Sequence, residues 1–461
     1  MRFDGVDGKV GVDHPLEHKH KDSEPVTLSV EHVALPAASK KNNITALDGI
    51  RACAIILVMT FHINQMSLGL LWNPEQYPIA SALATFGGSG VTLFFILSGF
   101  LLFLPYAKSL LFQSNWPSAR QFYVKRMLRI IPAYYVALFA IILLFQQEYL
   151  QPDHWQKLAL FLTFFMDSSS STFRQLNGPF WTLAIEWQFY MILPLLALGF
   201  LLVAKRLPAL PRQRLLVMIG CCILLIVWGL FLRILANNTP IVKHPANIVV
   251  SVIFFFLYGM TGKYIENFAV GMIICLCYTY AWHPVHGSAL RQRLKNTSLF
   301  FVPLGLLLLF CMSIWHYNVG HMQVPAFAFL NVLAPQFEWL NEMIIALGYG
   351  SCVLGILFGP EWLQGIFSWK PLVWIGLISY GLYMWHLPLI SFFHVQLLPH
   401  IPITGQASYL LYWLSVLVIV IPVALLSYHL IEKPCTRLGA YLTKQMQARR
   451  IALAEERSLR G

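Results

Sequence analysis

Long apolar segments recur along most of the chain, and they constrain its fold more than any other feature. A helix that crosses a bilayer needs about 20 mostly apolar residues. Ten candidate spans lie near residues 46–71, 83–104, 132–146, 180–202, 215–236, 248–282, 298–316, 337–358, 371–397 and 408–431. Because hydrocarbon offers the backbone no hydrogen-bond partners, spans in such a bundle are helical. The sequence therefore predicts an all-α, polytopic membrane protein of about ten transmembrane helices.

Two of these spans have unusual lengths. The segment 132–146 is short, and we expect its helix to begin earlier, as an amphipathic stretch. The segment 248–282 is too long for one crossing and has Lys263 and Glu266 in its middle. Two interpretations remain open for it: one span with an interfacial or re-entrant piece, or two short spans.

Composition supports a membrane protein and divides the chain into three parts. Only 11% of its residues are charged, against roughly a quarter in soluble domains. Residues 1–45 are polar and predict a disordered cytoplasmic tail, followed by a membrane domain over 46–432 and a basic cytoplasmic tail over 433–461. No cleavable signal peptide is recognised, so the first span is expected to be an uncleaved anchor. The cysteines lie in apolar segments, and we expect no metal site and no permanently bound cofactor.

The basic residues predict the topology. With the N-terminus placed inside, 26 of the 32 lysines and arginines fall on the cytoplasmic side and four on the opposite side. Lys and Arg concentrate in cytoplasmic loops, so both termini are predicted to be cytoplasmic. An additional span at 268–282 would reverse every later loop and is rejected. The same loops account for the net charge of +12, and no nucleic-acid partner is indicated.

Arg51 and His62 stand in one apolar helix, ALDGIRACAIILVMTFHI at 46–63. Eleven residues make about three turns plus roughly 20°, so the two side chains share a helix face roughly 16 Å apart along the axis. Arg51 lies near the cytoplasmic end, and His62 lies in the outer half. Ionisable groups inside a membrane normally face the bundle interior or a wet cavity.

Two further titratable residues fall at a depth similar to that of His62. Glu186 lies about 9 Å below the outer end of its span, and His386 lies in the outer half of another span. We expect Glu186 to orient a histidine ring in a shared cavity. The alternative for His386 is a packing residue that is hydrogen-bonded to a neighbour.

A basic cluster precedes the third span, in ARQFYVKRMLRIIPAYY at 119–135. Lys125, Arg126 and Arg129 are typical of a segment that contacts anionic lipid headgroups. The alternative is a phosphate clamp, because guanidinium groups match phosphate oxygens in geometry.

Six stretches in chain order together resemble one family, the integral-membrane acyltransferase 3 family. They are the helix with Arg51-x10-His62, GGSGVTLFFILSGFLL at 87–102, FYVKRMLRIIPAYY at 122–135, GPFWTLAIEWQFYMILPLL at 178–196, ISYGLYMWHLPL at 378–389 and SYHLIEKP at 427–434. The resemblance covers residues 45 to 437. Thr182 stands where the family usually has serine, and the 267–282 stretch looks extended, which puts the boundary of the sixth span in doubt.

The resemblance implies a membrane O-acyltransferase. Such enzymes move an acyl group, usually acetyl, from cytoplasmic acyl-CoA to a hydroxyl of an envelope glycan or a glycosylated small molecule. The family's Arg-x10-His motif maps onto Arg51 and His62, and its Arg-x-x-Arg motif onto Arg126 and Arg129. The chain resembles the stand-alone form, without a fused hydrolase-like domain, and we expect it in the bacterial inner membrane among lipids.

We assign expected roles to eight residues on this basis. Three arginines, Arg51, Arg126 and Arg129, would hold the coenzyme A phosphates. His62 would be the general base for the acceptor hydroxyl, and a covalent acyl-His62 intermediate is an open alternative. Glu186 would orient His62 or contact the acceptor. Three residues, Trp181, Tyr383 and His386, would line the cavity.

Rival interpretations come from other classes of protein. Polar groups at mid-depth also suit a transporter or flippase of glycan or lipid, which would move substrate without consuming a thioester. A non-catalytic sensor of acyl-CoA is a third interpretation. The identity of the acceptor and of the acyl group is not encoded in any recognised motif.

Overall fold

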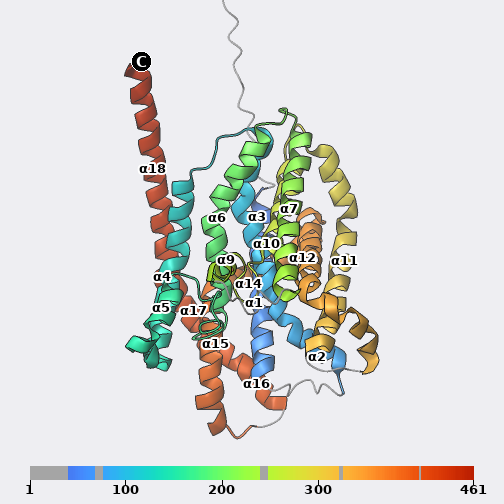
Figure 1. The fold of residues 1–461 in the computed structure, drawn as a ribbon, viewed down its shortest axis with the longest axis vertical. Helices are drawn as coiled ribbons and strands as arrows, with labels where there is room; N and C mark the ends of the chain where they lie inside the picture. The colour runs from blue at the N-terminus through green and yellow to red at the C-terminus, as the bar shows by residue number, and fades with distance from the viewer. Residues whose placement is uncertain (1–39, 68–75, 239–247, 321–324, 404–405, 461) are drawn as a thin grey trace, which may run out of the picture. The chain divides into compact units, whose positions relative to one another are not determined.

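The computed structural model describes residues 40–67, 76–238, 248–320, 325–403 and 406–460, and within these ranges the chain is helical with no β-strand (Figure 1). The α-helices are α1 (Lys40–Met66), α2 (Pro78–Thr85), α3 (Gly90–Phe112), α4 (Ala119–Phe145), α5 (Trp155–Leu162), α6 (Phe180–Ala204), α7 (Pro211–Asn238), α9 (Ile248–Leu257), α10 (Ile265–Ala281), α11 (Ser288–Gly320), α12 (Ala334–Phe358), α13 (Glu361–Phe367), α14 (Lys370–Leu377), α15 (Ser379–Phe392), α16 (Gln406–Ser415), α17 (Ile421–Ser427) and α18 (Lys433–Arg460). Short 3₁₀ turns are η1 (Phe86–Ser89), η2 (Gln147–Leu150), η3 (Pro152–His154), η4 (Pro325–Leu333) and η6 (Leu398–His400), and π turns are η5 (Phe393–Leu397), η7 (Val416–Val420) and η8 (Tyr428–Glu432).

The predicted all-α, polytopic membrane fold is confirmed. Among the described residues, eight helical stretches are long and apolar enough to cross a membrane, and α14 with α15 makes a ninth that is bent by 71°. The prediction was about ten spans, and the difference lies in the segment 248–282. Helices α9 and α10 replace it, with 10 and 17 residues.

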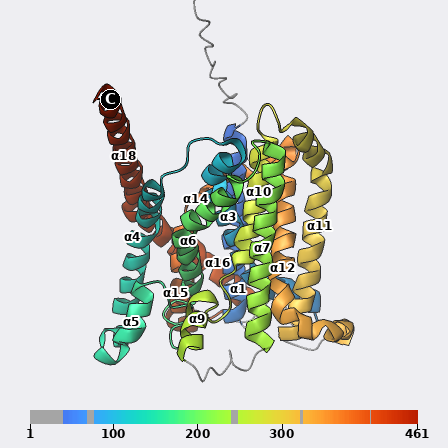
Figure 2. The same ribbon diagram turned by 45° about the horizontal axis from the view of Figure 1, so that its top comes forward.

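The backbone between α9 and α10 explains why this segment is not one helix. Gly259, Gly262 and Tyr264 all have positive φ angles, of 69°, 92° and 53°. A right-handed helix cannot pass through such residues. Helix α10 is buried against α3, α7 and α12 (Figure 2), which fits one span preceded by a short separate piece.

Helix α1, which carries Arg51 and His62, lies against the end of α13 and against α14 at very short range. A Cβ atom on Gly49 would lie 1.8 Å from the carbonyl oxygen of Phe367, and one on Gly376 would lie 1.9 Å from that of Asp48. Only glycine fits at both positions. This contact fixes the position of the Arg51 end of α1.

Helix α18 occupies the segment predicted as a C-terminal tail. It follows η8 without a break, runs from Lys433 to Arg460, and lies beside α4 (Figure 1). The Nε2 atom of Gln121 donates to the carbonyl oxygen of Thr443 across this contact, at 3.4 Å. Of the predicted N-terminal tail, residues 1–39 lie outside the described residues. The sidedness of both termini stays a prediction.

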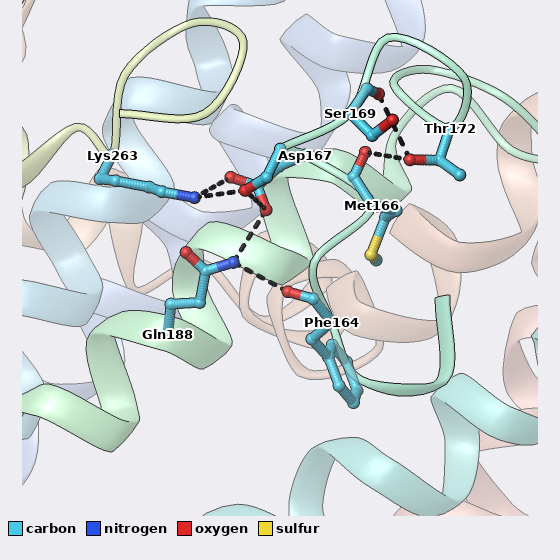
Figure 3. A network of polar contacts seen from close by, with 8 residues as sticks. Phe164, Met166, Asp167, Ser169, Thr172, Gln188 and Lys263 are labelled. Carbon is cyan, nitrogen blue, oxygen red and sulfur yellow. Dashed lines mark hydrogen bonds and ion pairs between the residues drawn. The ribbon is translucent and has the colours of Figure 1, made fainter. Parts of the chain in front are cut away.

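The segment between α5 and α6 is held in place by a network of polar contacts around Asp167 (Figure 3). Lys263 Nζ lies 2.5 Å from Asp167 Oδ2, and Gln188 Nε2 of α6 donates to Asp167 Oδ1 at 2.8 Å. Burial lowers the pKa of the Lys263 ammonium group, whereas the neighbouring Asp167 carboxylate acts to raise it. Farther along, Asn177 Nδ2 donates to the carbonyl oxygen of Met384 on α15 at 2.9 Å. These contacts together hold residues 163–179 against α6, the α9–α10 connection and α15.

Candidate functional site

A polar cavity lies inside the helical bundle, between α1, α3, α4, α6 and α15. The charged and hydroxyl-bearing residues that line it include Arg51, Ser98, Arg126, Arg129, Glu186 and Tyr190. Apolar side chains of α3 and α6 complete the wall. A polar interior of this kind, inside a bundle that is otherwise apolar, marks a binding or catalytic site.

A second cavity, of about 400 Å³, adjoins the first and reaches α18. Arg51, Arg129, Ser379 and Tyr380 line both cavities. Helix α18 adds Lys433 and Arg437 to the second cavity, and α1 adds Asp48. The two cavities therefore adjoin at Arg51 and Arg129, and together they are called the path below.

The arginines of this path differ in how far protein partners satisfy them. Arg51 Nη1 donates to Asp48 Oδ1 at 2.9 Å. The buried Nε atom of Arg126 has no hydrogen-bond partner in the part of the chain that the structure describes. Because a buried guanidinium without partners is costly, this site favours an anionic ligand.

Glu186 has two hydroxyl donors. Ser98 Oγ of α3 donates to Glu186 Oε1, and Tyr190 OH, one turn further along α6, donates to the same oxygen at 2.5 Å. We expected Glu186 to orient His62 or to contact the acceptor. The structure does not bring these two side chains together, because the Oε1 atom of Glu186 is turned toward α3 and Tyr190.

His62 instead contacts His386. Nδ1 of His62 lies 3.2 Å from Nε2 of His386, and the ring centroids are 5.0 Å apart. His386 is fully buried, with an exposed fraction of 0%, whereas His62 is half-buried. The sequence placed both histidines at one depth, and the structure brings them into contact.

Three polar side chains on α15, spaced three residues apart, join it to three other helices. Tyr380 OH donates to the carbonyl oxygen of Ile130 on α4 at 3.0 Å. The hydroxyls of Tyr383 and Thr182 on α6 are 2.5 Å apart. His386 contacts His62 on α1. Helix α15 thus fixes the relative positions of α1, α4 and α6 around the cavity.

The eight predicted site residues fall into two groups. Those that line the polar cavity are Arg51, Arg126, Arg129, Glu186 and Tyr383. Those that do not line it are His62, His386 and Trp181. The two histidines lie next to it, because the ring of Tyr383 is 5.9 Å from that of His386.

Trp181 was expected to line the cavity, but its side chain points elsewhere. Its indole lies 5.6 Å from the ring of Phe173 and 5.7 Å from that of Tyr264. One residue along a helix is a rotation of about 100°, so Trp181 faces away while Thr182 and Glu186, four residues apart, both face the cavity.

Sequence reasoning missed several polar residues of the path, among them Ser98, Tyr190, Lys433 and Arg437. Tyr190 follows Glu186 at a spacing of four, and Arg437 follows Lys433 at the same spacing, so helical periodicity held a signal for both pairs. Lys433 and Arg437 had been assigned to a tail. Ser98 lies in an apolar stretch with no pattern that distinguishes it from other small packing residues.

Comparison with known proteins gives a match over most of the chain. Residues 44–429 match the acyltransferase 3 family model, described as an acyltransferase domain. The chain is 26% identical over 366 residues to the peptidoglycan O-acetyltransferase OatA of Listeria monocytogenes, with 76% of this chain and 49% of that protein covered. It is 26% identical over 414 residues to the putative peptidoglycan O-acetyltransferase YrhL of Bacillus subtilis, with 86% and 55% covered.

A further relative is a putative O-acetyltransferase of Staphylococcus aureus, 26% identical over 435 residues, with 87% of this chain and 58% of that protein covered. The chain spans about half the length of these curated relatives. No solved structure matches it. Because the family model covers most of the chain, with the motifs of Arg51, His62, Arg126 and Arg129 inside the match, this multi-pass membrane protein belongs to the acyltransferase 3 family.

Proposed function

We propose that this protein is a membrane O-acyltransferase. It takes an acetyl group from cytoplasmic acyl-CoA and transfers it to a hydroxyl of an envelope glycan, in the bacterial cytoplasmic membrane. The observation that carries the proposal is the path between α1, α4, α15 and α18, lined by arginines and leading toward a histidine pair. The names of the relatives support the reaction class.

The donor would occupy the two adjoining cavities. Coenzyme A carries several phosphate charges, and guanidinium groups form bidentate, charge-assisted hydrogen bonds with phosphate oxygens. Arg129 at the junction and Lys433 and Arg437 at the α18 end would hold that end of the molecule. Arg51, at the same junction, would hold the phosphate nearest the pantetheine arm, and the arm would extend from there through the inner cavity past Tyr383.

The acyl group would reach His62 at the inner end of this path. Arg51 and His62 share a face of α1 and are separated by roughly 16 Å along its axis. The extended pantetheine arm has a comparable length. The separation of the two motif residues thus matches a donor that is bound at its phosphates and reacts at its thioester.

His62 would act as the general base. It removes the proton of the acceptor hydroxyl as the oxygen attacks the thioester carbonyl carbon. The carbon–sulfur bond breaks, the ester forms, and the coenzyme A thiolate takes up the proton. A positioned base typically contributes 10²–10⁴-fold to such a step. A covalent acyl-His62 intermediate is the alternative route through the same residue.

The acceptor is proposed to be peptidoglycan or another glycan of the cell envelope. Two of the relatives carry peptidoglycan in their names. The network around Asp167 holds the segment 163–179 against α6 (Figure 3). The hydrogen bond from Asn177 to Met384 on α15 brings the same segment close to the His386 end of the site. This segment would shape the approach of the acceptor from the outer side.

The test is thioester turnover by the full chain in lipid nanodiscs, with radiolabelled acetyl-CoA and a peptidoglycan fragment mixture. Wild type should transfer label to the glycan, while His62→Ala should bind acetyl-CoA and transfer almost none. The matched control is His394→Ala, a histidine outside the cavities that pairs with Tyr412. A wild-type protein that binds or moves glycan without consuming acetyl-CoA would instead indicate a transporter.

A further inference from the structure

The hydrogen bonds of His386 determine where its ring proton lies. Its Nδ1 atom is 2.9 Å from the carbonyl oxygen of Leu382 and 3.0 Å from that of Tyr383. A carbonyl oxygen accepts and never donates, so Nδ1 of a neutral His386 carries the proton. Its Nε2 atom is therefore an acceptor.

The same reasoning fixes the proton of His62. Its Nδ1 atom lies 3.2 Å from Nε2 of His386 and 3.0 Å from the carbonyl oxygen of Val58. Both partners are acceptors, so Nδ1 of His62 carries the proton and is shared between them. No described residue forms a hydrogen bond with Nε2 of His62, so the pair offers this one nitrogen unprotonated.

We propose that His386 is the positioning residue for His62: it fixes the tautomer and ring angle that present Nε2 of His62 as the base. The inference rests on the proposed function, in which His62 removes the acceptor's proton. When Nε2 takes that proton, the Nδ1–H group facing His386 becomes a charge-assisted donor, which is a stronger hydrogen bond.

A neutral partner is notable here because a carboxylate more often holds a catalytic histidine. In the ranges that the structure describes, neither ring is hydrogen-bonded to a carboxylate, and the nearby Glu186 is engaged by Ser98 and Tyr190. His386 is held rigidly by two carbonyls of its own helix and is fully buried. It can therefore stabilise the charged form of His62 without adding a buried charge of its own.

The kinetic test compares two substitutions of His386 in nanodiscs. His386→Leu removes the acceptor, and we expect kcat to fall about tenfold to a hundredfold while KM for acetyl-CoA changes less than about twofold. His386→Gln places an amide oxygen near the position of Nε2 and should recover most of that loss. His394→Leu, which removes a histidine paired with Tyr412 at 2.6 Å, should leave both constants unchanged.

Two kinetic results would overturn the inference. One is wild-type kcat in His386→Leu while His62→Ala is inactive, which would leave the proposed function intact. The other is a folded His386→Gln no more active than His386→Leu, because a hydrogen-bond acceptor alone would then not suffice.

A second measurement does not depend on activity. In protein labelled with ¹⁵N-histidine, the ring nitrogens of His62 should show a protonated Nδ1 and an unprotonated Nε2 in wild type, assigned by comparison with His62→Ala. In His386→Leu a population with the proton on Nε2 should emerge. A proton on Nε2 of His62 in wild type would contradict the inference even if no turnover were found.

Discussion

Arg129 lies at the junction of the two cavities and lines both of them. If it holds a phosphate of the donor, Arg129→Ala removes a charge-assisted interaction worth about 1.5–3 kcal/mol. KM for acetyl-CoA should then rise about tenfold to a hundredfold, with kcat little changed. The measurement is steady-state transfer of label at varied acetyl-CoA.

Arg120 provides the matched control for this prediction. It is exposed on the same helix, α4, and lines neither cavity. Arg120→Ala removes an equal charge from the same region and should leave KM unchanged. Equal effects of the two substitutions would mean that general surface charge, and not a site at Arg129, attracts the donor.

Single residues also mark the limit of what the sequence predicts about the site. Helix counting placed His62, Glu186 and His386 at one depth, and this follows from rise per residue alone. Which of them meet depends on how each helix is rotated about its axis. The sequence favoured Glu186 as the partner of His62, whereas the rotation of α6 turns Glu186 toward Ser98 and that of α15 brings in His386.

Helix α1 depends on Gly49 for its contact with the end of α13. Gly49→Ala would place a methyl group 1.8 Å from the carbonyl oxygen of Phe367, and the helices would have to separate. Overpacking of this kind typically costs about 1–3 kcal/mol, and it would displace Arg51, two residues away. We expect a lower midpoint of thermal unfolding in detergent. It would be measured by size-exclusion chromatography of samples heated to a series of temperatures.

Gly199 is the control for that substitution. It lies within α6, and a Cβ atom there would meet no atom within 4 Å. Gly199→Ala should keep or slightly raise the midpoint, because alanine favours helix over glycine by up to about 1 kcal/mol. A Gly49→Ala protein as stable as wild type would contradict the close contact of α1 with α13.

Helices α7 and α10 are joined by a buried ion pair. Arg233 Nε lies 2.6 Å from Glu266 Oε1, with side-chain exposures of 6% and 1%. Removing one partner leaves the other charge buried and unpaired. Arg233→Met should therefore lower the free energy of unfolding by about 3–5 kcal/mol. The double variant Arg233→Met with Glu266→Met should recover much of this loss. A double variant less stable than the single one, in the same heating assay, would contradict this account.

At the scale of elements, the hydrophobic runs and the distribution of charged residues predicted most of the helices. The 248–282 segment was the exception: the positive φ angles of Gly259, Gly262 and Tyr264 divide it into α9 and α10, and such a break agrees with both interpretations that the sequence left open. Helix α18 was predicted as a tail because its sequence is polar and charged, so no apolar run marked it. Its place beside α4 rests on tertiary contacts that a hydropathy pattern does not contain.

For the whole molecule, the prediction that carries the mechanism is the sidedness of the membrane domain. The charge distribution places α18 in the cytoplasm and the 163–179 segment outside. In a variant without native cysteines, Ser170→Cys should react with a membrane-impermeant maleimide on intact cells. Gln447→Cys on α18, which is also exposed, should react only after the cells are permeabilised. The reverse pattern would place the arginine-lined path on the wrong side for a cytoplasmic donor.

The most direct measurement of the central claim is acetyl transfer across a sealed membrane. Proteoliposomes would enclose peptidoglycan fragments, and radiolabelled acetyl-CoA would be added outside, where molecules with α18 outward can bind it. The account predicts that label accumulates on the enclosed glycan with wild type and does not with His62→Ala. Label found only on glycan supplied on the same side as acetyl-CoA would contradict a path that leads from a cytoplasmic donor to an acceptor on the other face.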